Sequence, residues 1–152
     1  MRIESSAFQH QQPIPPKHTC DGEDVSPPLR FIDVPDDAMS FVLIVDDPDV
    51  PPAVSADRNW DHWLVWNIPP QTREIREGEH PTGVEGRNSW GRNEYGGPCP
   101  PDREHRYFFK LFALDITLDL NASAGKSDLL PAIEGHVLAQ AELVGLYDRK
   151  RR

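Results

Sequence analysis

Prolines divide this chain into short pieces. Sixteen of its 152 residues are proline, which is about twice the usual share of roughly 5%. They gather at residues 13–16, 27–28, 48–52, 69–70 and 98–101. Because proline lacks a backbone N–H and its ring clashes with the preceding helical turn, these clusters interrupt helices. The segments between them are therefore expected to fold mainly as short elements joined by turns.

Three apolar runs between the proline clusters predict β-strands. Residues 41–45, 63–68 and 107–114 are rich in β-branched and aromatic side chains and are short for helices. The first run is apolar throughout, which predicts a central strand covered on both faces, whereas the third keeps Arg106 and Lys110 on one face. The turns between the runs favour an all-β sandwich of two sheets over βαβ units.

One short helix is expected near the C-terminus, over residues 126–136. Ser127 or Asp128 stands near its start and Gly135 near its end. Pro131 is predicted to fall within the first turn or so, because deeper in a helix it would cost about 3 kcal/mol. Residues 138–147 alternate in polarity and predict a final strand. The expected class is thus all-β with minor α.

Length and charge narrow the classes of protein to which this chain can belong. The length fits one domain spanning residues 1–152. The net charge of −9 and the absence of a basic stripe with interleaved aromatics argue against a nucleic-acid partner. No apolar run approaches the roughly eighteen residues of a membrane span, and the first residues do not resemble a secretory signal. We expect a soluble protein of the cytoplasm without a transmembrane segment.

Cysteine spacing gives no sign of a metal site. Cys20 and Cys99 lie far apart, with no CxxC pair and no Cys/His spacing typical of zinc. In a reducing compartment they are expected to be two free thiols, although their proximity in space stays open. We predict no metal and no cofactor.

Polar residues lie at the ends of the apolar runs, where a rigid scaffold commonly presents a pocket. Asp46-Asp47-Pro48-Asp49 follows the first run, and Asp61-His62 directly precedes the second. A third segment runs from Tyr95-Gly96-Gly97-Pro98-Cys99-Pro100-Pro101 to His105-Arg106-Tyr107.

With these segments in this order, the sequence resembles the phosphatidylethanolamine-binding protein family, which includes the Raf kinase inhibitor protein and small bacterial and archaeal relatives. The resemblance spans nearly the whole chain, from Thr19-Cys20-Asp21-Gly22 to Ala141-Glu142-Leu143-Val144-Gly145. It implies a Greek-key β-sandwich with a small pocket for phosphate-like and carboxylate-like anions, including phospholipid headgroups.

The resemblance also implies which residues bind the ligand. The residues that match the family's pocket positions are Asp47, Asp49, His62, His105 and Tyr107, with Gly97, Pro98 and Pro100 in the lining loop. Arg106 is left out, because strand alternation points it to the other face.

The chemistry of such a pocket follows from its residue types. A neutral histidine offers one donor and a charged one offers two, and a tyrosine adds a hydroxyl. A carboxylate such as Asp47 would oppose an anion but favour a protonated imidazole, so we expect it to orient a histidine. Structural roles stay open: His62 as a hydrogen-bonded strand histidine, Asp46 as a turn residue and Tyr107 as a core aromatic. The tryptophans are read as packing residues, with Trp63 able to border the pocket.

Three classes of function fit the sequence. The first is non-catalytic binding of small anions or headgroups, with regulation or inhibition of kinases or proteases as an extension. The second is a hydrolase using an Asp-His pair, although no serine or cysteine lies in a nucleophile-elbow pattern. The third is a structural or dimerisation module; a homodimer stays open, since no self-complementary patch is evident. We predict the first class, and not an enzyme.

Overall fold

The computed structural model describes residues 1–149. Most of its regular structure is extended. The strands are β1 (Arg2–Glu4), β2 (Gln12–Pro13), β3 (Leu29–Ile32), β4 (Ser40–Asp47), β5 (Trp60–Ile68), β6 (Glu74–Ile75), β7 (Val84–Glu85), β8 (His105–Leu114) and β9 (Val137–Tyr147), and the helices are η1 (Pro16–His18), which is 3-10, and α1 (Lys126–Ile133).

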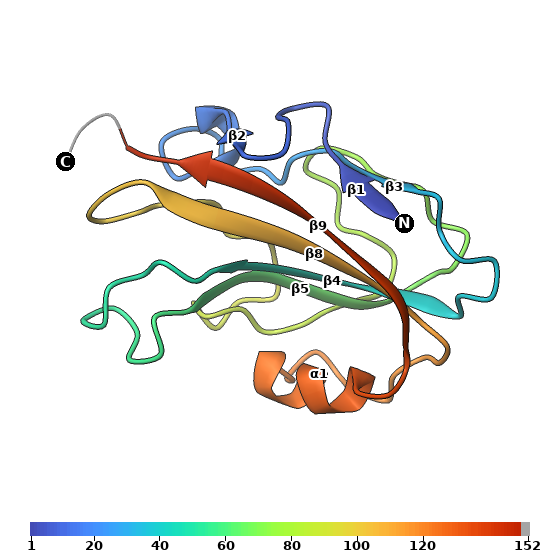
Figure 1. Ribbon diagram of the computed structural model, residues 1–152. Helices are drawn as coiled ribbons and strands as arrows, with labels where there is room; N and C mark the ends of the chain where they lie inside the picture. Colours follow the sequence, from blue (N-terminus) through green and yellow to red (C-terminus); the bar gives the residue numbers. More distant parts are fainter. Residues whose placement is uncertain (150–152) are drawn as a thin grey trace.

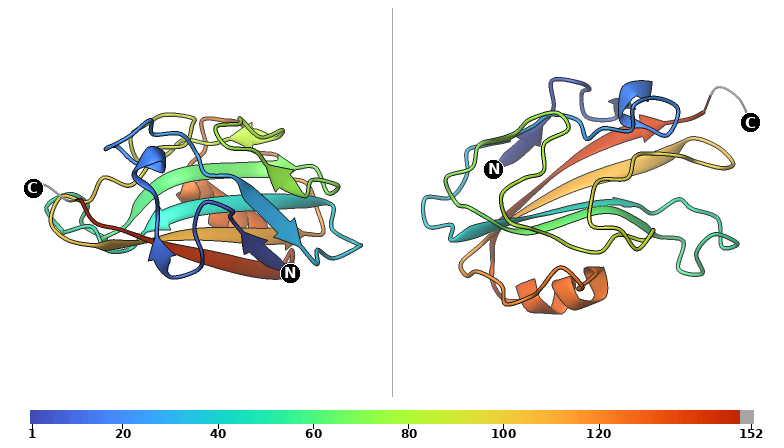
Figure 2. Two further views of the ribbon diagram at one scale, coloured as in Figure 1. Left: turned by 90° about the horizontal axis from the view of Figure 1, so that it is seen from above. Right: turned by 180° about the vertical axis from the view of Figure 1, so that it is seen from behind.

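The strands form two sheets. The larger has the order β2-β9-β8-β4-β5-β7, and the smaller has the order β1-β3-β6. All pairs are antiparallel except β2 with β9. The small sheet lies over one face of the large sheet and α1 over the other (Figure 1), an arrangement that the side and rear views also show (Figure 2). The predicted all-β class with one short helix is confirmed.

Strand β4 is apolar throughout because it is covered on both faces. Phe41, Leu43 and Val45 pack in the core on the small-sheet side. Val42 and Ile44 pack on the α1 side. With β5 and β8 as its neighbours, β4 is the central strand that its sequence predicted, and each such buried side chain contributes about 1.5–3 kcal/mol.

Helix α1 differs from the prediction in the place of its proline. The helix begins at Lys126, directly after Gly125, whose N–H donates to the Asp128 carboxylate at 3.2 Å. Counted from Lys126, Pro131 is the sixth helical residue and not part of the first turn. The burial of Leu129 and Ile133 against the large sheet fixes the helix there, and this contact outweighs the hydrogen bond that proline removes. Within the described chain, no helix has the length and apolar character that crossing a membrane requires.

Candidate functional site

The antiparallel register brings the predicted site residues to one edge of the large sheet. Asp47 lies opposite Trp60, and Asp46 lies opposite Phe108. The C-terminal end of β4 therefore lies between the N-terminal ends of β5 and β8, beside the loops that follow β4 and precede β8 (Figure 1). Polar residues that are far apart in the sequence meet here.

A β-bulge turns His62 toward the same side as its partners. Val45 lies opposite Trp63 but Asp46 lies opposite Asp61, so His62 is an extra residue in β5. A bulge of this kind re-aims a side chain that strict alternation would send to the other face. The His62 ring accordingly meets the Tyr107 ring edge-on, with centroids 5.3 Å apart.

A small cavity of about 270 Å³ opens at this edge. Its size suits a small chemical group rather than a drug-sized molecule, for which pockets run from about 300 to 1,000 Å³. Four of the eight predicted binding residues line it: Asp47, His62, Pro100 and Tyr107. The remaining lining residues are Val50, Val54, Trp60, Trp90, Cys99 and Pro101.

The backbone of Gly96 fixes the orientation and tautomer of His62. His62 Nδ1 lies 2.7 Å from the Gly96 carbonyl oxygen, and the Gly96 N–H donates to the His62 carbonyl at 3.0 Å. Because a carbonyl only accepts, Nδ1 carries the proton. Burial lowers the pKa of His62 to about 4, so the ring is neutral at pH 7. In the part of the chain that the structure describes, Nε2 has no protein partner.

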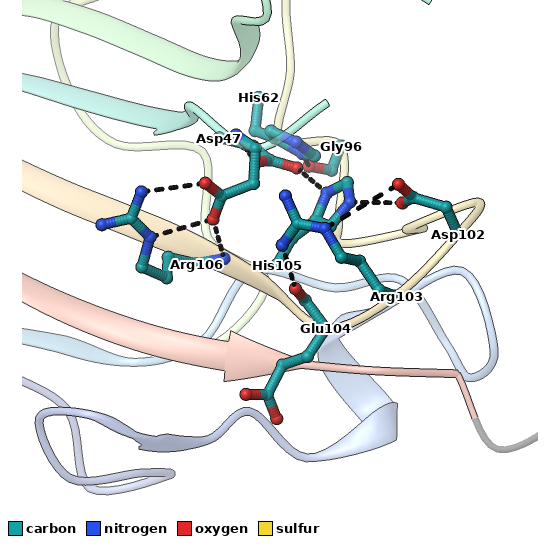
Figure 3. A network of polar contacts seen from close by, with 9 residues as sticks. Asp47, His62, Gly96, Asp102, Arg103, Glu104, His105 and Arg106 are labelled. Atoms are coloured by element: carbon teal, nitrogen blue, oxygen red, sulfur yellow. Dashed lines mark hydrogen bonds and ion pairs between the residues drawn. The ribbon is translucent and has the colours of Figure 1, made fainter. Parts of the chain in front are cut away.

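His105 lies between two carboxylates, as Figure 3 shows. Its Nδ1 is 2.6 Å from Asp47 Oδ2 and its Nε2 is 2.6 Å from Asp102 Oδ1. The two hydrogen bonds need two protons, so the three groups together carry a charge of −1. Burial raises the pKa of Asp47, opposed by hydrogen bonds from the Asp49 N–H and from His105. His105 is fully buried and does not line the cavity, so it positions Asp47.

Two buried donors at the cavity have no hydrogen-bond partner. Within residues 1–149, the buried side-chain atoms without one are Tyr107 Oη and Trp60 Nε1, and both residues line this cavity. Burial raises the pKa of Tyr107 well above its usual value, and the nearby Asp47 carboxylate raises it further, so the hydroxyl keeps its proton. An unsatisfied buried polar group costs about 1–3 kcal/mol. Two such donors on residues that line one cavity could each donate to a group that accepts hydrogen bonds.

A comparison with protein families identifies the family of this chain. The model of the family described as "Phosphatidylethanolamine-binding protein" matches residues 4–148. The chain belongs to the phosphatidylethanolamine-binding protein family. Its relatives include a UPF0098 protein of Chlamydia trachomatis, 47% identical over 149 residues and covering 98% of this chain and 99% of the relative. One from Methanothermobacter thermautotrophicus is 48% identical over 155 residues, with coverage of 98% and 99%.

Solved structures of the family share the fold. The crystal structure of the Chlamydia trachomatis homologue CT736 has a TM-score of 0.95 at 47% identity, covering 97% of each chain. Escherichia coli YbcL, described as a member of the mammalian family, has a TM-score of 0.88 at 29% identity, covering 98% of each chain. The family and the sandwich fold that the sequence predicted are thus confirmed.

Asp49 was expected at the pocket, but its carboxylate faces Arg106. It accepts hydrogen bonds from the Arg106 backbone N–H at 2.9 Å and from the guanidinium at 2.8 and 2.9 Å. This pairing lowers the pKa of Asp49. Asp49 does not line the cavity. Arg106 lies on the exposed face of β8, opposite its buried neighbours His105 and Tyr107, as strand alternation predicted.

Gly97 and Pro98 anchor the pocket loop rather than line the cavity. The Gly97 N–H donates to Asp24 at 2.8 Å, and the Pro98 carbonyl accepts from the Cys20 N–H at 3.1 Å. A Cβ on Gly97 would lie 2.3 Å from both Asp24 Oδ1 and the His18 carbonyl oxygen, so only glycine permits this close approach.

The expectation of two free thiols is wrong. Cys20 and Cys99 form a disulfide across a sequence separation of 79 residues. Local spacing carries no sign of this pairing, because the register of distant segments brings the two sulfurs together. The bond ties residues 16–24 to the loop that forms one wall of the cavity.

Two tryptophans that the sequence suggested only as packing residues lie at the cavity. Trp60 and Trp90 line the cavity, and Trp90 packs edge-on against His62 with centroids 5.0 Å apart. Trp63, which the sequence left able to border the pocket, lines a separate hollow and donates to Glu85 at 3.3 Å. The position of Trp60 opposite Asp47 could have been inferred only with the strand register known.

Neither a second hollow nor a metal-binding cluster offers a better candidate site among the described residues. A larger hollow of about 610 Å³ lies between the first ten residues and β9, but its lining residues include neither of the two unpartnered buried donors. Among residues 1–149, no group of three His, Cys, Asp or Glu side chains is placed to hold a metal ion.

Proposed function

We propose that this cavity binds a small oxyanion group without catalysing a reaction. Phosphate and the phosphate of a phospholipid headgroup have the chemistry that it suits. The observation that carries the proposal is the pair of unpartnered donors, Tyr107 Oη and Trp60 Nε1, at one cavity. Oxyanion oxygens accept hydrogen bonds from both kinds of donor.

The arrangement of the other polar groups supports binding over hydrolysis by an Asp-His pair. Both ring nitrogens of His105 are held by carboxylates, which leaves none to accept a proton from a nucleophile. Cys99 is oxidised in the disulfide. The free Nε2 of His62 is a weak base, because its pKa of about 4 lies far below neutral pH.

Protein partners, oligomeric state and cellular compartment are further parts of the proposal. Regulation of kinases or proteases stays a prediction from the family resemblance, as does a homodimer.

The disulfide supports an oxidising compartment in place of the cytoplasm that the sequence predicted, because cytoplasmic thiols are kept reduced. Alkylation of fractionated cells before and after reduction tests this: in the compartment that holds the protein, Cys20 and Cys99 should react only after reduction.

A titration tests the binding proposal. Addition of inorganic phosphate or phosphoethanolamine should perturb the NMR signals of His62 and Tyr107. Tyr107→Phe removes one donor to a charged group, a loss of about 1.5–3 kcal/mol, and should weaken affinity about 10- to 100-fold. Asp49→Asn is the matched control and should keep its affinity, because that carboxylate faces Arg106. Absence of binding to the wild type at millimolar concentrations of either ligand would overturn the proposal.

A further inference from the structure

The cavity offers hydrogen-bond acceptors as well as donors. Its donor side chains are Tyr107 and Trp60, whose hydroxyl and indole N–H are buried and have no hydrogen-bond partner among the described residues. The Asp47 carboxylate and His62 Nε2 are its acceptors, since the only proton on the neutral His62 ring is donated to the Gly96 carbonyl. A ligand that satisfies this set must itself donate a hydrogen bond as well as accept.

A fully deprotonated oxyanion fails that requirement. Its oxygens would accept from Tyr107 and Trp60, but one would then face the lone pair of His62 Nε2. Facing lone pairs repel, and a polar group left without its partner in a buried site costs affinity.

The charge at the cavity acts in the same direction. No lysine or arginine lines it. Asp47 in its wall belongs to a hydrogen-bonded chain with His105 and Asp102 that carries a charge of −1, and Arg103 balances part of that charge at the far end, 4.0 Å from Asp102. Two negative charges on a ligand are therefore less well tolerated than one.

We propose that the cavity selects the protonated form of its oxyanion, a phosphate monoester monoanion, whose P–OH group donates to His62 Nε2. Its remaining oxygens accept from Tyr107 and Trp60. This inference rests on the proposed function and names its ligand class. A phosphate diester, such as an intact phospholipid headgroup, has no P–OH group and satisfies the site less well.

The pH dependence of binding follows from the ligand. A phosphate monoester has its second pKa near 6, so the monoanion fraction falls about 30-fold between pH 5 and pH 7.5. Affinity should fall by the same factor. The ionisable groups around His62 are Asp47, Tyr107 and His105 on its own side of the sheet, with Asp46 and Asp61 acting on it through their charges. Their effect is common to every ligand compared at one pH.

A size-matched pair of ligands and a larger diester separate the outcomes. Phosphoethanolamine is a monoester, ethanolamine O-sulfate has the same shape without a proton in this pH range, and glycerophosphoethanolamine is the diester of the lipid headgroup. Calorimetry at pH 5.5 should show the sulfate and the diester binding at least about tenfold more weakly than the monoester. Equal affinity for either would overturn the selection but leave the proposed function standing. If none of the three binds, both proposals fall.

Two variants assign the selection to His62. His62→Gln places a carboxamide that can donate or accept in the position of Nε2, and should bring the affinities for sulfate and phosphate esters within about threefold of each other. Tyr107→Phe should weaken both and keep their ratio. If His62→Gln does not fold, ¹⁵N NMR of wild-type protein with phosphoethanolamine decides: a protonated Nδ1 and an unprotonated Nε2 are expected, and a doubly protonated ring would overturn the proposal.

Discussion

Asp46 and Asp47 are neighbours in the sequence, but their carboxylates face opposite sides of the large sheet. Asp46 Oδ2 contacts Lys110 Nζ at 3.1 Å and Lys126 Nζ at 3.0 Å on the side of α1. Asp47 contacts His105 at the cavity. Strand alternation thus gives one carboxylate a structural role and the other a place at the site.

Asp46→Asn should lower stability without changing ligand affinity. Lys126 keeps its 2.6 Å contact with Asp61, so the loss is expected at about 1–3 kcal/mol rather than the larger cost of an isolated buried charge. Urea denaturation measures the loss, and phosphoethanolamine titration checks the affinity. A strong drop in affinity would contradict the separation of the two carboxylates by the sheet.

The titration of His62 predicts how stability depends on pH. Its pKa in the folded protein is about 4, against 6.5 as its ordinary value. The unfolded chain therefore binds more protons between these values, and stability falls as the pH drops from 6.5 toward 4. The full effect is on the order of 3 kcal/mol.

His62→Gln should remove the loss of stability that His62 causes as the pH drops from 6.5 toward 4. Denaturation of wild type and variant at several pH values between 4 and 7 gives the difference, in which the titration of all shared carboxylates cancels. Parallel curves for His62→Gln would contradict a neutral, buried His62.

The sequence predicted the strands more closely than it predicted the site. The uninterrupted apolar run of β4 and the alternation of β8 follow from how many faces of a strand are covered, which is a local property. The bulge at His62, the approach of Cys20 to Cys99 and the turn of Asp49 toward Arg106 depend on strand register, which no single segment specifies. The family resemblance supplied the pocket residues but did not separate those lining the cavity from those supporting it.

The disulfide is expected to stabilise both the fold and the pocket wall. It closes a loop of 79 residues, for which chain entropy predicts about 4.5 kcal/mol, with observed losses of about 2–5 kcal/mol. A reductant should lower the melting temperature of the wild type and weaken phosphoethanolamine binding. The Cys20→Ser/Cys99→Ser variant should start from the lower melting temperature and not respond to reductant. An equal response in both proteins would contradict the assignment.

Gly97 tests whether the loop depends on its close approach to residues 18–24. Gly97→Ala puts a methyl group 2.3 Å from Asp24 Oδ1 and the His18 carbonyl oxygen, so the backbone must move, at a cost of about 1–3 kcal/mol. The displaced loop carries Cys99 and Pro100 in the cavity wall, so affinity should fall together with stability.

Gly125→Ala is the matched control for this prediction. Its added Cβ would lie no closer than 3.6 Å to its neighbour, the Arg87 carbonyl oxygen, and Gly125 lies at the start of α1 on the other side of the large sheet. It should cost less than about 1 kcal/mol and leave phosphoethanolamine affinity unchanged. A Gly97→Ala protein as stable and as tight-binding as this control would show that the loop can retreat from residues 18–24 freely, and that the close approach of Gly97 does not hold the cavity wall in place.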